Sequence, residues 1–158
     1  MKTLIAYATS HGCTEQCAEK VRDGLDGEVE TINLRRNTRT DPADFDRVII
    51  GGSIHAGRIQ GRIKRYCSKH EKTLLTKKLG LFLCCMEKED RAREQFDANY
   101  PETLRNHAAA AGIFGGAFNL EKMNFVAKAI VRKVAGVTES VNEISEEAID
   151  RFIEAFKK

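Results

Sequence analysis

The 158-residue sequence predicts a three-layer, doubly wound α/β domain built on a five-stranded parallel sheet. Three observations predict this fold. Short apolar runs are hydrophobic on both faces, as in parallel strands that helices cover on both sides. Helical patterns separate these runs, which favours crossover connections. No internal repeat or linker interrupts the chain, so we expect one domain over residues 1–158.

Five segments have the length and composition of buried strands. The third runs into Gly51 and Gly52, where we expect it to stop. The fifth is rich in glycine, which weakens a strand. In chain order, the expected strands are Lys2 to Ala8, Glu28 to Leu34, Asp46 to Ser53, Leu79 to Cys85, and Ala110 to Phe118.

Between these strands and after the last one, apolar residues recur at spacings of three and four, which is typical of helices with one buried face. A turn or short helical element is expected at Asp41-Pro42. The expected helices are Thr14 to Leu25, Gly61 to Leu75, Lys88 to Tyr100, Glu102 to Ala109, Lys122 to Val134 and Ser145 to Phe156.

Composition and charge narrow the class of protein. No apolar run approaches the ~20 residues that a membrane-spanning helix needs. The chain has five cysteines, an odd number, and no export signal is recognised in the sequence. Both observations indicate reduced thiols in the cytoplasm rather than a disulfide scaffold. The net charge is +3, and residues 51–80 carry eight lysines and arginines against one glutamate. That stretch favours anionic partners, unless it is only a solvated helix face.

The loop between the first strand and the first helix is the strongest candidate site. It offers hydroxyl groups, a glycine that permits close approach, and the free amides of a helix start, which together suit a phosphate monoester. The motifs of triphosphate-binding and dinucleotide-binding loops are absent. The alternative is that Thr14 only caps the helix. The candidate phosphate ligands are Thr9, Ser10, His11, Gly12, Cys13 and Thr14.

This loop resembles the phosphate loop of flavodoxins, with the match at Thr9, Gly12, Thr14 and Glu15. His11 and Cys13 depart from the usual hydroxyl residue and asparagine. The stretch DRVIIGGSIHAG, residues 46–57, is similar to that of the bacterial menaquinone-dependent protoporphyrinogen oxidases and their flavodoxin-domain relatives. It departs at Ala56, where that family tends to have an aromatic residue, and at residues 58–61.

The resemblance implies a flavodoxin-like fold that binds FMN non-covalently, with the phosphate in the first loop. It also implies that the flavin ring lies between the loops after the third and fourth strands. The aromatic partner that usually stacks on the ring is missing from both loops. The residues expected around the ring are Ser53, Ile54, His55, Ala56 and Gly57 on one side, and Cys85 and Met86 on the other.

The resemblance further implies an oxidoreductase that dehydrogenates a porphyrinogen-like substrate and passes electrons to a quinone or a protein acceptor. No side chain stands out as an acid or base. The alternative is a flavodoxin-type electron carrier between protein partners, although such carriers are typically acidic and this chain is basic. A cytoplasmic protein is expected. The basic amphipathic pattern of Lys122 to Val134 would allow peripheral contact with the inner face of the membrane, unless this segment packs on the sheet.

Three other kinds of chemistry are weaker. Cys85 and Arg91 have the C-x5-R spacing of cysteine phosphatases, but acidic residues between them would repel phosphate. Cys13 and Cys17 lie four residues apart beside His11, yet no second cluster completes a zinc site, so no metal is expected. Nucleic-acid binding is not expected either, because the cations are not interleaved with aromatic residues.

Overall fold

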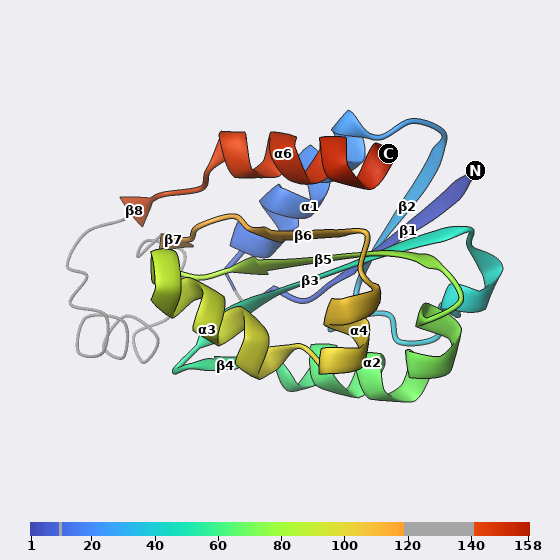
Figure 1. Cartoon of the computed structure of the whole chain (residues 1–158), viewed down its shortest axis with the longest axis horizontal. Coiled ribbons are helices and arrows are strands. Elements are labelled where there is room, and N and C mark those ends of the chain that lie inside the picture. Colours follow the sequence, from blue (N-terminus) through green and yellow to red (C-terminus); the bar gives the residue numbers. More distant parts are fainter. Residues whose placement is uncertain (10, 119–140) are drawn as a thin grey trace.

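A computed structural model describes residues 1–9, 11–118 and 141–158. Five parallel strands form its main sheet in the order β2-β1-β3-β5-β6 (Figure 1). The expected doubly wound five-stranded sheet is therefore confirmed. Its strands are β1 (Lys2–Tyr7), β2 (Glu28–Asn33), β3 (Arg47–His55), β5 (Lys78–Cys84) and β6 (Ala110–Ile113).

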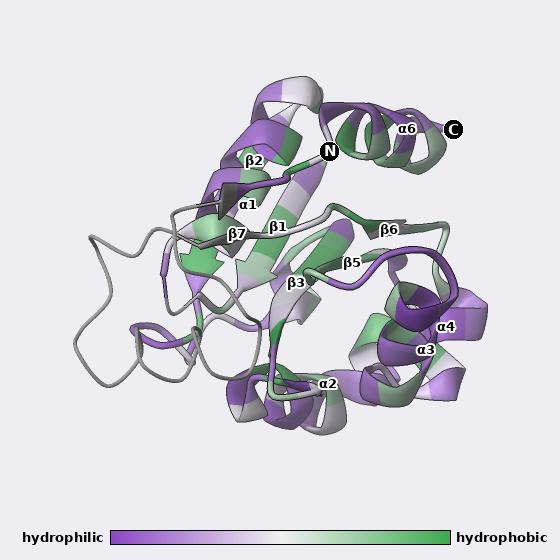
Figure 2. Cartoon of the chain, turned by 90° about the vertical axis from the view of Figure 1, so that its left-hand side faces the viewer, coloured by the Kyte–Doolittle hydropathy of each residue, from purple (hydrophilic) through white to green (hydrophobic). Residues whose placement is uncertain are grey.

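Helices cover both faces of this sheet, which makes the three layers visible in Figures 1 and 2. One face carries α1 (Cys13–Gly24) and α6 (Glu146–Lys157). The opposite face carries α2 (Gly61–Leu74), α3 (Glu89–Asn99) and α4 (Glu102–His107), with a short 3-10 helix, η1 (Pro42–Asp44), close to α2. No helix in the described ranges is long and apolar enough to cross a bilayer. The helix expected over Lys122 to Val134 lies outside the described residues.

The central strands are hydrophobic on both sides because each face of the sheet has its own core. Along β5, Leu81 and Leu83 pack toward α2 and α3, whereas Phe82 and Cys84 pack toward α1 and α6. This alternation follows from the two-residue repeat of a strand. All four side chains are essentially excluded from water, which explains why the sequence of β5 is a continuous apolar run.

The expected end of the third strand at its two glycines is wrong. Strand β3 continues to His55, turns at Ala56 and Gly57 with φ of 52° and 79°, and pairs antiparallel with β4 (Arg58–Ile59). Gly51 and Gly52 are needed for packing instead. A Cβ at Gly51 would lie 1.9 Å from Phe82 Cζ, and one at Gly52 would lie 2.6 Å from Ile59 Cδ1.

The fifth expected strand, Ala110 to Phe118, is two strands. After β6 ends, Gly115 adopts a left-handed conformation with φ of 79°, which redirects the chain. The following strand β7 (Ala117–Phe118) pairs antiparallel with β8 (Val141–Asn142) in a separate two-stranded sheet.

Candidate functional site

The candidate site lies where the carboxyl ends of β1, β3 and β5 meet. Strand β2 lies next to β1 on one flank, and β3 lies next to β1 on the other. The direction in which strands are added therefore reverses between β1 and β3. Ligands of such sheets bind in the crevice at this point. A pocket is found there, lined by Thr9, His11, Cys13, Ser53, Ile54, His55, Cys84, Cys85, Met86 and Gly116.

Most of the residues expected at the site line this one pocket. Cys84, where the loop after β5 begins, also lines it, and the structure adds Gly116, which the sequence analysis did not single out. Ser10 lies outside the described residues. The others fall outside the pocket lining: Gly12 and Thr14 at the start of α1, and Ala56 and Gly57 in the turn between β3 and β4.

The first loop leads directly into the first turn of α1. Gly12 precedes the helix with φ of 90°, and its N–H donates to Thr9 Oγ1 at 2.8 Å. The first helical bond runs from the Gln16 N–H to the Gly12 carbonyl at 3.0 Å. Since the first residues of a helix have no intrahelical acceptor, the N–H groups of Thr14 and Glu15 in the first turn of α1 are left for other partners. A Cβ on Gly12 would meet nothing within 4 Å, so the space beside the loop is open.

The hydroxyl of Thr14 is buried and unpaired. The residue is 0% exposed, and its Oγ1 has no hydrogen-bond partner among the described residues. Gly12 is the N-cap of α1, and Thr14 is the second residue of the helix, so the alternative that Thr14 merely caps the helix is wrong. A buried hydroxyl without a partner costs about 1–3 kcal/mol. An anion with acceptor oxygens, such as a phosphate at the start of α1, would give this hydroxyl a partner.

Arg35 adds a positive charge that the sequence analysis missed. It follows β2, the neighbour of β1, and its Nη1 donates to the Thr9 carbonyl at 3.1 Å. Arg35 reaches the first loop because β2 lies next to β1 in the sheet. In the sequence, the position of a cation just after the second strand was the one sign of this role. Its guanidinium adds to the positive end of α1 at the same place.

Two histidines occupy the pocket wall. The rings of His11 and His55 lie 5.9 Å apart between centroids, and His55 Nε2 is 3.1 Å from Ser53 Oγ. Burial, followed by the charge of Arg35, lowers the pKa of His11. His55 keeps an exposed edge, but the surrounding protein desolvates its ring enough to lower its pKa, and His11 adds to the effect. Both imidazoles are therefore neutral at pH 7, and each can donate one hydrogen bond.

Asn99 fixes the β3–β4 hairpin, which forms one side of the site, to α3. Its Oδ1 accepts from the Ile59 N–H at 3.0 Å, and its Nδ2 donates to the carbonyls of Gly57 and Gln95 at 3.3 and 2.7 Å. The side chain is only 7% exposed, which makes these bonds costly to break. The hairpin is thus held in one position relative to the sheet.

The pocket chemistry does not favour a cysteine phosphatase. Burial raises the pKa of the Cys85 thiol to about 11, so the thiol stays protonated, whereas phosphoryl attack needs a thiolate. No residue lining the described pocket is Phe, Tyr or Trp. A flat ligand here would be contacted by Ile54, Met86 and the two histidines.

Comparisons with known proteins agree with this geometry. A flavodoxin domain family matches residues 4–145. A protoporphyrinogen IX dehydrogenase [quinone] from Leishmania major is 21% identical over 156 residues, covering 90% of this chain and 68% of that protein.

Solved structures share the fold. Flavodoxin 1 from Bacillus cereus has a TM-score of 0.58 at 16% identity, covering 99% of this chain and 95% of its own. A Fusobacterium nucleatum flavodoxin bound to flavin mononucleotide has a TM-score of 0.55 at 12% identity, with the same coverage of both chains. The match over residues 4–145 shows that this chain belongs to the flavodoxin domain family.

Proposed function

We propose that the chain binds FMN non-covalently, with the phosphate at the start of α1. The observation that carries this proposal is the fully buried hydroxyl of Thr14 in the first turn of α1, which has no hydrogen-bond partner among the described residues. Thr9, Ser10, His11, Gly12 and Cys13 would complete the phosphate site. Arg35 would add charge from the neighbouring strand.

The flavin ring would lie between the β3–β4 hairpin and the loop that follows β5. Residues 53–57 would contact one side of it, and Cys85 and Met86 the other. When bound there, FMN would supply the transfer of hydride equivalents or single electrons. The contribution of the chain is to bind, orient and desolvate the ring. The hairpin is suited to this because Asn99 holds it to α3.

As the activity, we propose the dehydrogenation of a porphyrinogen-like substrate, with a quinone as electron acceptor. The pocket wall supports this because histidines and Met86 leave a bound ring less covered than aromatic side chains would. Positive charge also supports it. Arg62, Arg65 and Lys69 of α2 line a second cavity and would attract the carboxylates of such a substrate. The name of the Leishmania major relative points to the same chemistry.

We place this activity in the cytoplasm, where a quinone is reached at the inner face of the membrane. None of the five cysteines, all in the described part of the chain, forms a disulfide, which suits a reducing compartment. The basic amphipathic sequence of residues 122–134 would contact the membrane there.

The proposal is tested first by binding. Calorimetric titration of the flavin-free chain should show one tightly bound FMN and at least tenfold weaker binding of riboflavin, which lacks the phosphate. Equal affinities would contradict the phosphate assignment. Flavin-loaded protein is then incubated without oxygen with a porphyrinogen and a menaquinone analogue. Formation of porphyrin that requires the quinone supports the enzyme. Tight FMN binding with no turnover, and a very low potential for the second electron, would indicate an electron carrier instead.

A further inference from the structure

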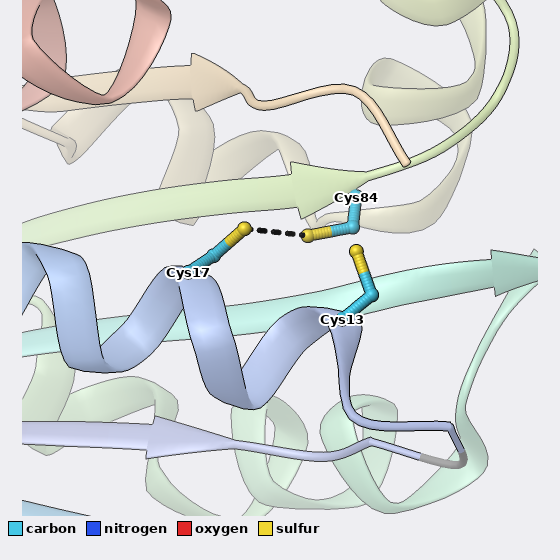
Figure 3. A group of neighbouring side chains, drawn as sticks. All are labelled: Cys13, Cys17 and Cys84. Atoms are coloured by element: carbon cyan, nitrogen blue, oxygen red, sulfur yellow. Dashed lines mark hydrogen bonds between the residues drawn. The ribbon is translucent and has the colours of Figure 1, made fainter. Parts of the chain in front are cut away.

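Three cysteine side chains from α1 and β5 point toward one another (Figure 3). Cys13 and Cys17 lie one turn apart on the same side of α1, and Cys84 ends β5. Their sulfur atoms all lie within 4.8 Å of one another. The Cys84 thiol donates to Cys17 Sγ at 3.6 Å. Residues distant in sequence thus form a compact group of sulfur atoms, which we call the trithiol cluster.

We propose that the trithiol cluster binds one thiophilic metal ion of the zinc class, with a fourth coordination position open to the pocket. Zinc–thiolate bonds of about 2.3 Å at tetrahedral angles place neighbouring sulfur atoms about 3.8 Å apart. The sulfur atoms already lie close to this separation, so small rotations of the three side chains would bring them around one ion.

The donor set selects the kind of ion. Three sulfur atoms and no carboxylate make up the cluster, and soft thiolate ligands favour zinc-like or monovalent copper ions over magnesium or calcium. Three thiolates around a divalent ion leave one net negative charge. Cys13 is the first residue of α1, so the positive end of a 12-residue helix lies beside that charge.

The open position follows from burial. Cys17 is 0% and Cys84 2% exposed, whereas Cys13 is half-buried. Cys13 and Cys84 also line the pocket, together with His11 and His55. A fourth ligand would therefore come from the pocket, as water, a small molecule or an imidazole. Sites with three protein ligands and one exchangeable position are typical of reactive rather than structural zinc.

The other two cysteines cannot join the cluster. Cys85 follows Cys84 directly, and the alternation of the strand directs it to the opposite core. Cys67 lies on α2, on the same far side of the sheet. Cys67 is 1% exposed, about as buried as Cys17 and Cys84, so it provides a matched control.

The test is a metal titration of the full-length chain. The protein is reduced with a phosphine, freed of metal and titrated with Cd²⁺, while sulfur-to-metal charge-transfer absorption is recorded in the ultraviolet. We expect absorption that saturates at one equivalent and is reversed by an excess of a strong chelator. In Cys13→Ser the charge-transfer absorption per bound ion should fall by about a third, and the affinity should drop at least tenfold. Cys67→Ser should match the parent protein.

Cys13→Ser is the lead variant because the half-buried side chain is the least needed for folding, and thermal unfolding verifies that it folds. Cys17→Ser and Cys84→Ser extend the series. Absence of charge-transfer absorption in the reduced parent would overturn the proposal, as would identical titrations of the parent and Cys13→Ser. The result does not depend on flavin, so failure to bind FMN would leave it standing.

Discussion

The side chain of Gln60 is hydrogen-bonded to Ser53 at both of its ends. Gln60 Oε1 accepts from the Ser53 N–H at 2.9 Å, and Gln60 Nε2 donates to Ser53 Oγ at 2.7 Å. The same Nε2 donates to the carbonyl of Ala8, just after β1, at 3.1 Å. One amide therefore joins the ends of β1 and β3 at the point where the pocket forms.

Replacing Gln60 with alanine should loosen the pocket wall. Gln60→Ala leaves the Ser53 N–H and the Ala8 carbonyl without partners, and we expect a loss of about 1–3 kcal/mol in the free energy of unfolding. FMN affinity should fall as well. Urea denaturation and flavin titration measure the two effects. Asn37→Ala removes an exposed amide that bonds the Thr40 hydroxyl and the Arg39 N–H, where water can replace both bonds, and it should change neither.

Thr14→Val tests whether the unpaired hydroxyl is kept for a ligand. Valine has nearly the same shape without the hydroxyl, so the flavin-free variant should be more stable by about 1 kcal/mol. FMN affinity should fall about tenfold or more, because a hydrogen bond to a charged group is lost. Thr3→Val is the control. Its buried hydroxyl accepts from Arg47 Nε at 2.9 Å, so this variant should lose stability and keep FMN affinity.

Arg35→Gln tests the charge that the sequence analysis missed. At low salt we expect FMN affinity to fall about two- to fivefold, the size of a solvent-exposed ion pair, with riboflavin affinity unchanged. Added salt should weaken FMN binding to the parent more than to the variant, since salt screens an exposed charge. An equal effect on FMN and riboflavin would instead place Arg35 against the ring.

Local patterns in the sequence predict the layers of this fold but not the contacts between them. Both faces of β5 are buried, so its sequence is apolar throughout, and the strand is evident without a structure. The trithiol cluster needs strand order as well. The four-residue spacing of Cys13 and Cys17 places two of its sulfur atoms on one side of α1, but only the placement of α1 across β5 brings Cys84 to them.

Glycines show the same limit at the β3–β4 hairpin. In the sequence, Gly51 and Gly52 indicate the end of a strand. In the structure, glycine is required at both positions because Phe82 and Ile59 occupy the space that a side chain would need. A glycine required for close packing and one required for a turn look identical in a sequence. The partners that distinguish them are set by the tertiary fold.

Gly51→Ala therefore should disrupt the core. The new Cβ would lie 1.9 Å from Phe82 Cζ, and Phe82 is itself stacked on Phe114 at 4.8 Å between centroids. We expect a loss of about 1–3 kcal/mol or more, as for other overpacked cores. Gly57→Ala is the comparison, because no atom lies within 4 Å of the new Cβ there. Only the left-handed φ of 79° opposes this substitution, and we expect it to lower the free energy of unfolding by about 1 kcal/mol. Urea denaturation compares the two, and equal losses would contradict the packing explanation.

The two pocket histidines should make the flavin-free protein less stable in mild acid. Burial lowers the pKa of both His11 and His55 in the folded chain, aided by Arg35 at the first and by His11 at the second. The unfolded chain, with pKa values near 6.5, then binds more protons as the pH falls through that value, so the free energy of unfolding decreases. The loss levels off below the folded pKa values.

Denaturation series between pH 8 and pH 5 measure this dependence. The double variant His11→Gln/His55→Gln should show a shallower decrease than the parent. The variant should keep the part of the decrease that comes from His70, because burial lowers the pKa of that histidine as well. The folded pocket favours neutral imidazoles. If the parent protein instead became more stable on acidification, these rings would be charged in the folded state. Their role as neutral hydrogen-bonding groups would then be wrong.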